Sequence, residues 1–172
     1  MCLQLVNTLR VLISNHHRDT HHVLIGRFMS FKDLGVNAAL IKALHTAGIE
    51  KPFPIQKATL PDAIAGKDIL GRGQTGSGKT LAFGLALISR LAGKTAAPMR
   101  PLALILSPTR ELAMQISDVI APLSRSVNLN SQVVAGGLSY SKQIQALKRG
   151  VPIVVATPGR LIDLIQKKHI KL

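Results

Sequence analysis

The amino-acid sequence predicts an α/β fold, built as an open, mostly parallel sheet with helical crossovers. From Phe28 onward, short apolar segments alternate with segments whose apolar residues recur on one helical face. The short segments have the uninterrupted apolar character of parallel strands that are covered on both faces. Regular alternation of the two kinds gives one sheet with right-handed connections. The length of 172 residues suits one domain with a substantial core.

The predicted strands are four short apolar runs: 68–71, 102–106, 132–135 and 152–156. In sheets of this kind, ligands bind beside the carboxyl ends of the strands. The loops that follow the predicted strands are 71–79, 107–110, 136–137 and 157–160. We therefore expect these four loops to share one face of the domain.

The helices are predicted from apolar residues that share a face and from start signals. Such residues are Leu112, Ile116, Val119, Ile120 and Leu123 in one segment, and Ile41, Leu44 and Ala47 in the segment after Asn37. Two further starts are expected at Ser107-Pro108 and Thr157-Pro158, where a hydroxyl precedes a proline at the first helical position.

A glycine-rich segment between an apolar pair and a long apolar run is typical of a phosphate-binding loop. The segment has the pattern G-x-x-x-x-G-K-T and comprises Gly73, Gln74, Thr75, Gly76, Ser77, Gly78, Lys79 and Thr80. Its glycines allow positive φ, so that backbone N–H groups can turn onto phosphate oxygens, and the following helix adds its N-terminal dipole. Lys79 can reach the terminal phosphates, and the Thr80 hydroxyl can bind Mg²⁺. The alternative is a glycine-rich turn with a solvated lysine, which the flanking segments disfavour.

The charge balance points to a polyanionic partner. The chain has 22 Lys and Arg against 8 Asp and Glu, a formal net charge of +14, so nucleic acid is the first candidate. A basic surface that serves only solubility is the alternative. One tyrosine and four phenylalanines make an aromatic base-stacking platform a poor explanation, so contacts to backbone phosphates fit better.

The first 27 residues are predicted to be an extension outside the fold. They contain three arginines and one acid, which leaves an organellar transit peptide open as an alternative. A polar linker explains His16, His17, His21 and His22 better than a metal site does, because no carboxylate or thiol set accompanies them. The single Cys2 fits a reducing compartment, and we expect a cytoplasmic location. No apolar run of membrane-spanning length occurs, and nothing in the sequence requires an oligomer.

A second candidate site precedes the phosphate loop. Gln56 lies in a proline-rich approach, and its amide can pair with the edge of adenine, while Phe31 can pack on the base. Taken alone, this segment is better explained as a turn before a helix with an exposed glutamine.

Five segments, in order, resemble the motifs of DEAD-box ATP-dependent RNA helicases. Phe31 with 48–56 resembles the Q motif, which spans 29–57, and 74–80 resembles motif I. The sequence Pro-Thr-Arg-Glu-Leu-Ala at 108–113 matches motif Ia, Gly136-Gly137 the GG motif, and Thr-Pro-Gly-Arg at 157–160 motif Ib. The resemblance covers 28–172. Gly73 stands where the family usually has alanine.

This resemblance implies the first, RecA-like lobe of a helicase, with ATP and Mg²⁺ as cofactors and RNA as partner. By the family's motifs, Phe31 and Gln56 would hold adenine, and 73–80 would hold the phosphates, with Lys79 and Thr80 as the catalytic pair. The implied contacts to the RNA backbone are Pro108, Thr109, Arg110, Gly136, Gly137, Thr157 and Arg160. None of these reads bases, so binding should be independent of sequence and sensitive to salt.

In this family, the Asp-Glu-Ala-Asp motif II follows motif Ib, and the sequence to Leu172 does not include it. We therefore expect a truncated lobe with little ATP hydrolysis by itself and a marginal fold. A non-catalytic module that binds RNA or nucleotide is the alternative function. A P-loop kinase or transporter ATPase does not explain Gln56 or 108–113.

Overall fold

The structure, a computed structural model, describes residues 2–3 and 29–172. Helices and strands alternate along most of the described chain. The helices are α1 (Ala38–Thr46), α2 (Pro54–Ile64), α3 (Lys79–Leu91), α4 (Arg110–Arg125), α5 (Tyr140–Arg149) and α6 (Pro158–Gln166). The strands are β1 (Cys2–Leu3), β2 (Ala103–Leu106), β3 (Ser131–Val134) and β4 (Ile153–Ala156).

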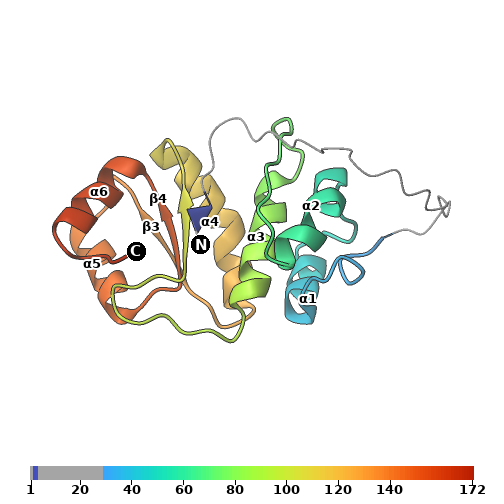
Figure 1. Cartoon of the computed structure of the whole chain (residues 1–172), viewed down its shortest axis with the longest axis horizontal. Coiled ribbons are helices and arrows are strands. Elements are labelled where there is room, and N and C mark those ends of the chain that lie inside the picture. Colours follow the sequence, from blue (N-terminus) through green and yellow to red (C-terminus); the bar gives the residue numbers. More distant parts are fainter. Residues whose placement is uncertain (1, 4–28) are drawn as a thin grey trace.

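The strands form one parallel sheet in the order β1-β2-β4-β3. Val154 at the centre of β4 is opposite Leu104 on one side and Gln132 on the other. Figure 1 shows α5 and α6 beside one face of the sheet and α4 beside the other, with α3, α2 and α1 beyond α4. The predicted open parallel α/β architecture is therefore confirmed.

Two apolar cores lie on opposite faces of the sheet. Because side chains alternate along a strand, Leu104 and Val154 belong to the core under α5 and α6, whereas Ile105 and Val155 belong to the larger core under α3 and α4. All four residues of β4 are fully buried, as expected for a central parallel strand. The larger core extends away from the sheet and includes Leu44 of α1 and Leu60 of α2.

The predicted strand at 68–71 is wrong. These residues belong to no helix or strand, and Leu70 is an exposed large apolar side chain. A strand exists only where a neighbouring strand accepts and donates its backbone hydrogen bonds, and no described strand pairs with this segment. The other three predicted strands are confirmed as β2, β3 and β4, with ends that shift by one residue.

Cys2 and Leu3 differ from the prediction of an extension outside the fold, since they pair with Leu104 and Ile105 at the outer edge of β2. A sheet edge presents unpaired N–H and C=O groups, which makes it a template for any extended segment. The rest of the predicted extension, including the four histidines and the transit-peptide alternative, lies outside the described residues.

The helix starts agree with the sequence in part. The helix predicted after Asn37 begins at Ala38, and Asn37 caps it with its Oδ1 accepting from the Ala39 N–H at 2.8 Å. On α1, however, Leu40 and Leu44 are the buried residues, while Ala47 caps the C-terminus. The start predicted at Ser107-Pro108 is wrong: α4 begins at Arg110, because the Thr109 hydroxyl caps it by accepting from the Leu112 N–H at 3.2 Å. In α6, Pro158 is in the first turn as predicted, but the Thr157 hydroxyl makes no capping hydrogen bond.

Helices α3 and α4 approach each other closely at Gly84. A Cβ added to Gly84 would lie 2.5 Å from Cδ1 of Ile120, which is fully buried. We expect Gly84→Ala to lower the free energy of unfolding by about 1–3 kcal/mol through overpacking, and Ile120→Val to lower it by about 1 kcal/mol through a lost methyl group. The double variant lacks the clashing Cδ1, so urea denaturation should give less than the sum of the single effects. Strictly additive effects would contradict close packing at this point.

Within residues 2–3 and 29–172, no helix combines the length and apolar character needed to cross a bilayer.

Candidate functional site

The phosphate loop leads directly into α3. Gly76 and Gly78 have φ of 82° and 83°, as predicted, whereas Gly73 is not in the left-handed region. Gly78 is the N-cap of α3 and has no side chain with which to cap it. The N–H groups of the first helical turn lack partners within the helix, and the helix dipole is positive there. This geometry suits a bound phosphate.

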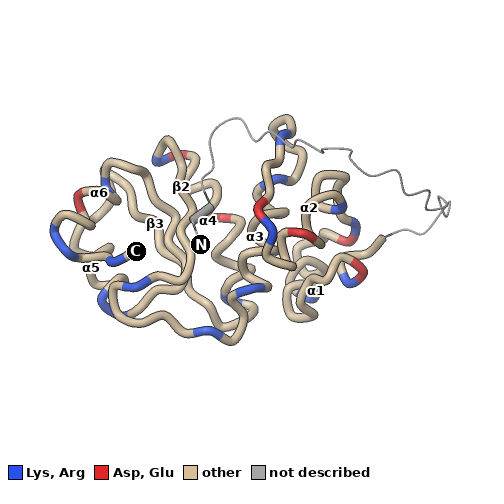
Figure 2. The backbone as a smooth tube through the Cα atoms, viewed as in Figure 1, with Lys and Arg blue, Asp and Glu red and all other residues tan. Residues whose placement is uncertain are grey.

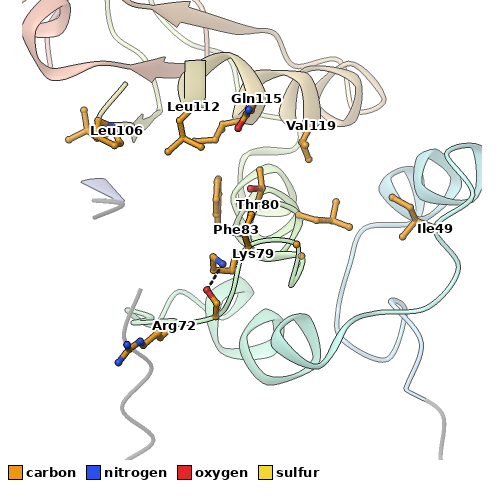
Figure 3. A pocket seen from close by; sticks show the side chains of 16 residues that line it. Ile49, Arg72, Lys79, Thr80, Phe83, Leu106, Leu112, Gln115 and Val119 are labelled. Carbon is orange, nitrogen blue, oxygen red and sulfur yellow. Dashed lines mark hydrogen bonds between the residues drawn. The ribbon is translucent and has the colours of Figure 1, made fainter. Parts of the chain in front are cut away.

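Lys79 closes the loop in the structure. Its Nζ donates to the carbonyl oxygens of Gly73 and Gln74, each at 2.5 Å, and lies 3.4 Å from the Ser77 hydroxyl. Figure 3 shows the ammonium group folded back against the loop. A phosphate oxygen carries a full charge and is a stronger acceptor than a neutral carbonyl, so the same ammonium group can turn to a ligand.

Glycine at position 73 leaves room for Ser77. A Cβ at this position would lie 2.7 Å from the Ser77 Oγ. An alanine here would therefore require the short Ser77 side chain to turn away from its present position.

The side chain of Gln56 ties the start of α2 to the start of α3. Its Oε1 accepts from the Phe53 N–H at 2.9 Å, and its Nε2 donates to the Gly78 carbonyl at 3.1 Å. Gln56 is fully buried, which differs from the exposed glutamine of the simpler interpretation. The segment thus contacts the phosphate loop directly, although the two are 22 residues apart.

Phe31, the predicted adenine neighbour, is 3% exposed and belongs to the larger apolar core. The structure therefore does not bring its ring to an open surface beside Gln56. Its contact with a base stays a prediction.

A pocket of about 640 Å³ lies between the phosphate loop, α3 and α4. Figure 3 shows Thr80 and Phe83 of α3 facing Leu112, Gln115 and Val119 of α4 across this space. Loop, helix and strand residues all contribute to its lining, which is Ile49, Arg72, Gly73, Thr75, Gly76, Gly78, Lys79, Thr80, Leu81, Phe83, Leu106, Pro108, Leu112, Gln115, Ile116 and Val119. Sequence reasoning missed Arg72 and Gln115. The position of Arg72 beside Gly73 was a usable signal, whereas Gln115 required the helix face to be known.

The three later loops meet at the carboxyl ends of their strands, as predicted. The Ser107 N–H donates to the Ala156 carbonyl and the Thr157 N–H to the Val134 carbonyl, each at 2.9 Å. Gly137, with φ of 76°, lies directly against the guanidinium of Arg110. The positive φ favours glycine there, whereas the flexible Arg110 side chain could move away from a Cβ. The phosphate loop shares the pocket with Leu106 and Pro108, so it lies near this face although no strand precedes it.

Gln143 fixes the Gly136-Gly137 loop, and the sequence analysis missed it. Its Nε2 donates to the carbonyls of Ala135 at 3.1 Å and Leu138 at 3.3 Å, on either side of the glycine pair. The side chain is 1% exposed, and its Oε1 has no partner among the described residues. The sequence alone does not distinguish Gln143 from a surface glutamine, because its burial on α5 is seen only in the structure.

Two arginines on this face have different surroundings. Arg110 pairs with Glu111 at 3.0 Å, and both side chains are exposed. The pKa of Glu111 is held below its ordinary value, first by a hydrogen bond from the backbone and second by a hydrogen bond from the Arg110 side chain. Arg160 lies over the ring of Tyr140, with Cζ 5.0 Å from the ring centroid, and its buried Nη1 has no partner in the described part of the chain.

No cluster of three or more His, Cys, Asp or Glu that could hold a metal occurs among the described residues. The two acids after Glu111 both lie in helices, Asp118 in α4 and Asp163 in α6, where Asp163 pairs with Lys167 at 2.7 Å. The predicted Mg²⁺ ligand, Thr80, lies in the first turn of α3 beside the loop. A hydroxyl oxygen is a suitable donor for Mg²⁺, which commonly takes its other ligands from water and nucleotide phosphates.

The parallel sheet and the phosphate loop that opens α3 define a P-loop nucleotide-binding fold. The family model of the DEAD/DEAH box helicases matches residues 53–172. The chain therefore belongs to this family.

Two known proteins show how far the similarity extends. The DEAD-box ATP-dependent RNA helicase CshA of Streptococcus pneumoniae is 44% identical over 144 residues, which is 84% of this chain and 27% of CshA. The crystal structure of the RNA helicase Prp28 from Chaetomium thermophilum, bound to ADP, aligns with a TM-score of 0.76 and 36% identity. It covers 82% of this chain and 35% of Prp28. The chain thus spans about a quarter to a third of these relatives, and the predicted helicase lobe is confirmed.

Proposed function

We propose that this chain is the ATP-binding and RNA-binding part of an ATP-dependent RNA helicase that separates short RNA duplexes locally. The observation that carries the proposal is the position of the phosphate loop. It opens α3 beside a pocket that Leu106 and Pro108 also line, at the carboxyl end of β2. Nucleotide and RNA would therefore lie close to each other, as coupling requires. The single Cys2 is consistent with a cytoplasmic location, which is part of the proposal.

The triphosphate would bind at residues 73–80. Backbone N–H groups at the start of α3 would surround the phosphates, and Lys79 would leave the carbonyls of Gly73 and Gln74 to contact the terminal phosphates. Thr80 would hold Mg²⁺, which neutralises charge on the phosphates when it is bound.

Adenine recognition is assigned to Gln56 and Phe31. The Gln56 amide uses one of its two N–H donors and one acceptor site inside the protein, which leaves one donor and one acceptor site. Because the side chain is fully buried, we expect these sites to reach a base only after the segment before α2 moves. A donor and an acceptor together are what the N6/N7 edge of adenine requires. Because Phe31 is buried, we expect its influence on the base to depend on a movement of the segment before α1.

RNA would bind across the loops at the carboxyl ends of β2, β3 and β4. Arg110 is exposed there, and the open space beside Gly136 permits close approach of a sugar-phosphate chain. Gly137, which lies against the Arg110 guanidinium, is a further proposed contact. The remaining proposed contacts are Pro108, Thr109, Thr157 and Arg160.

Among the described residues, the pocket lining supplies cations, hydroxyls and amides but no carboxylate. Phosphoryl transfer to water needs a carboxylate on the metal and a group that orients the attacking water. We therefore propose that these residues bind ATP without efficient turnover. This same feature favours the second candidate function, a non-catalytic module that binds RNA or nucleotide.

Filter binding of labelled RNA at two salt concentrations, with and without ATP, tests the proposal. We expect RNA affinity to fall with salt, by a logarithmic slope of about 0.7 for each phosphate contact to a single strand, and to rise when ATP is present. A scrambled RNA should bind equally well. A steep salt slope with no response to ATP would favour the non-catalytic module, and no RNA binding at all would contradict both.

A further inference from the structure

Three segments that are distant in the sequence meet at Met99, at the amino ends of the strands. The Met99 N–H donates to the Leu147 carbonyl at 2.7 Å, and the Met99 carbonyl accepts from the Lys171 N–H at 2.8 Å. Met99 has φ of 59°, a conformation uncommon for a residue other than glycine. The turn is therefore held by tertiary contacts on both sides and not by its local preference.

A second contact fixes the same segments. Gly150 ends α5 with φ of 85°, and a Cβ at this position would lie 2.5 Å from the Ala96 carbonyl oxygen. The backbone before β2 thus lies directly on the end of α5. These contacts hold the three segments in fixed positions relative to one another, so the side chains on them stay close together.

These converging segments carry cations and no acids. We name as the basic edge the exposed residues Lys94, Arg100, Lys148, Arg149 and Lys171. No Asp or Glu occurs in 92–102, 145–152 or 166–172. Figure 2 shows lysines and arginines without acidic residues along the chain near the C-terminal end of α5 and the C-terminus.

The charge is not explained by helix capping alone. Lys148 and Arg149 lie in the last turn of α5, where cations stabilise the helix dipole. Arg100 and Lys171 belong to other segments, and the hydrogen bonds of Met99 bring those segments to α5. Like charges that are held together without acidic partners attract a polyanion.

We propose that the basic edge is a second RNA-binding surface, which contacts the sugar-phosphate backbone of RNA that continues beyond the loops at the carboxyl ends. The choice of RNA rests on the proposed function. The two surfaces lie at opposite ends of four-residue strands, about 13 Å apart along the strands themselves. A short oligonucleotide on the carboxyl-end loops does not reach the basic edge, whereas a longer RNA does.

The experiment compares short and long single-stranded RNA in filter binding across a salt series. For the triple variant Arg100→Gln, Lys148→Gln and Lys171→Gln, we expect the logarithmic salt slope for long RNA to fall by about 2, because each lost cation removes about 0.7. The slope for short RNA should not change. The charge-conserving triple Arg100→Lys, Lys148→Arg and Lys171→Arg is the matched control and should keep the original slope.

Two further measurements separate the possible failures. The first is Arg110→Gln, which should weaken the binding of both short and long RNA. If the original protein does not bind short RNA, but the neutralised triple variant still lowers the salt slope for long RNA, only the proposed function is contradicted. An unchanged slope for long RNA in the neutralised triple variant, with an unchanged thermal unfolding midpoint, would overturn the basic edge. The second is binding to phosphatidylcholine vesicles that contain phosphatidylserine. If the neutralised triple variant loses vesicle binding while its RNA binding is unchanged, the basic edge binds a lipid surface and the RNA proposal is overturned.

Discussion

Replacing Lys79 by alanine is expected to weaken the binding of MgATP by about ten- to a hundredfold. A hydrogen bond to a charged group contributes about 1.5–3 kcal/mol to binding. Lys79 is the cationic residue within the phosphate loop and would donate such a bond to the terminal phosphates. In the free protein, the same group holds the loop through the carbonyls of Gly73 and Gln74. The variant therefore loses both the phosphate contact and the group that shapes the loop before binding. Titration with a fluorescent adenosine nucleotide in the presence of Mg²⁺ measures the effect.

Lys67→Ala is the matched control for Lys79→Ala. Lys67 pairs with Asp62 at 2.8 Å, but both side chains are exposed, so their interaction is worth little. We expect ATP affinity and the free energy of unfolding to be nearly unchanged in this control. Equal nucleotide affinity in the Lys79 and Lys67 variants would contradict the assignment of the phosphate site.

The phosphate loop could be predicted from sequence because its geometry is local. Gly76 and Gly78 adopt the positive φ that the pattern requires, and α3 begins at Lys79 as expected. The helix predicted after Asn37 likewise begins at Ala38, where the Asn37 side chain caps it. In each case the residues that decide the conformation lie within a few positions of one another.

The predicted strand at 68–71 shows where local reasoning ends. An apolar run indicates that a segment prefers burial. A strand also needs a neighbouring strand for its backbone hydrogen bonds, and that neighbour lies elsewhere in the chain. In the structure, β2 pairs with β4 and with the two residues of β1, and none of these strands pairs with 68–71. The composition of the segment could not reveal this arrangement.

Contacts between polar side chains and distant parts of the chain could not be predicted from the sequence either. The Gln56 amide contacts Gly78, and Gln143 holds both ends of the Gly136-Gly137 loop. Sequence predicted a ligand-facing role for Gln56, yet the structure gives its amide a position inside the protein. For Gln143, only burial on α5 distinguishes it from a surface glutamine.

The contact between Gln56 and Gly78 predicts that alanine is more destabilising at Gly78 than at Gly76, a glycine with a similar backbone conformation. Gly76 and Gly78 have nearly the same φ, but a Cβ at Gly76 meets nothing within 4 Å, whereas a Cβ at Gly78 would lie 2.5 Å from the Gln56 Nε2. Alanine in the left-handed region costs about 1–2 kcal/mol at either position. At Gly78 it also displaces a buried amide from its hydrogen bonds, which costs about 1–3 kcal/mol more.

Urea denaturation should therefore give a loss of about 1–2 kcal/mol for Gly76→Ala and about 2–5 kcal/mol for Gly78→Ala. Adding Gln56→Ala to Gly78→Ala removes the displaced amide, so the cost of Gly78→Ala should then fall towards that of Gly76→Ala. The neighbour that remains is Cδ2 of Phe53 at 3.0 Å, and this half-exposed ring can move aside. This reduction is the decisive measurement, because backbone strain alone is the same in both backgrounds. If Gly78→Ala costs the same with and without Gln56, the amide does not join the start of α2 to the phosphate loop.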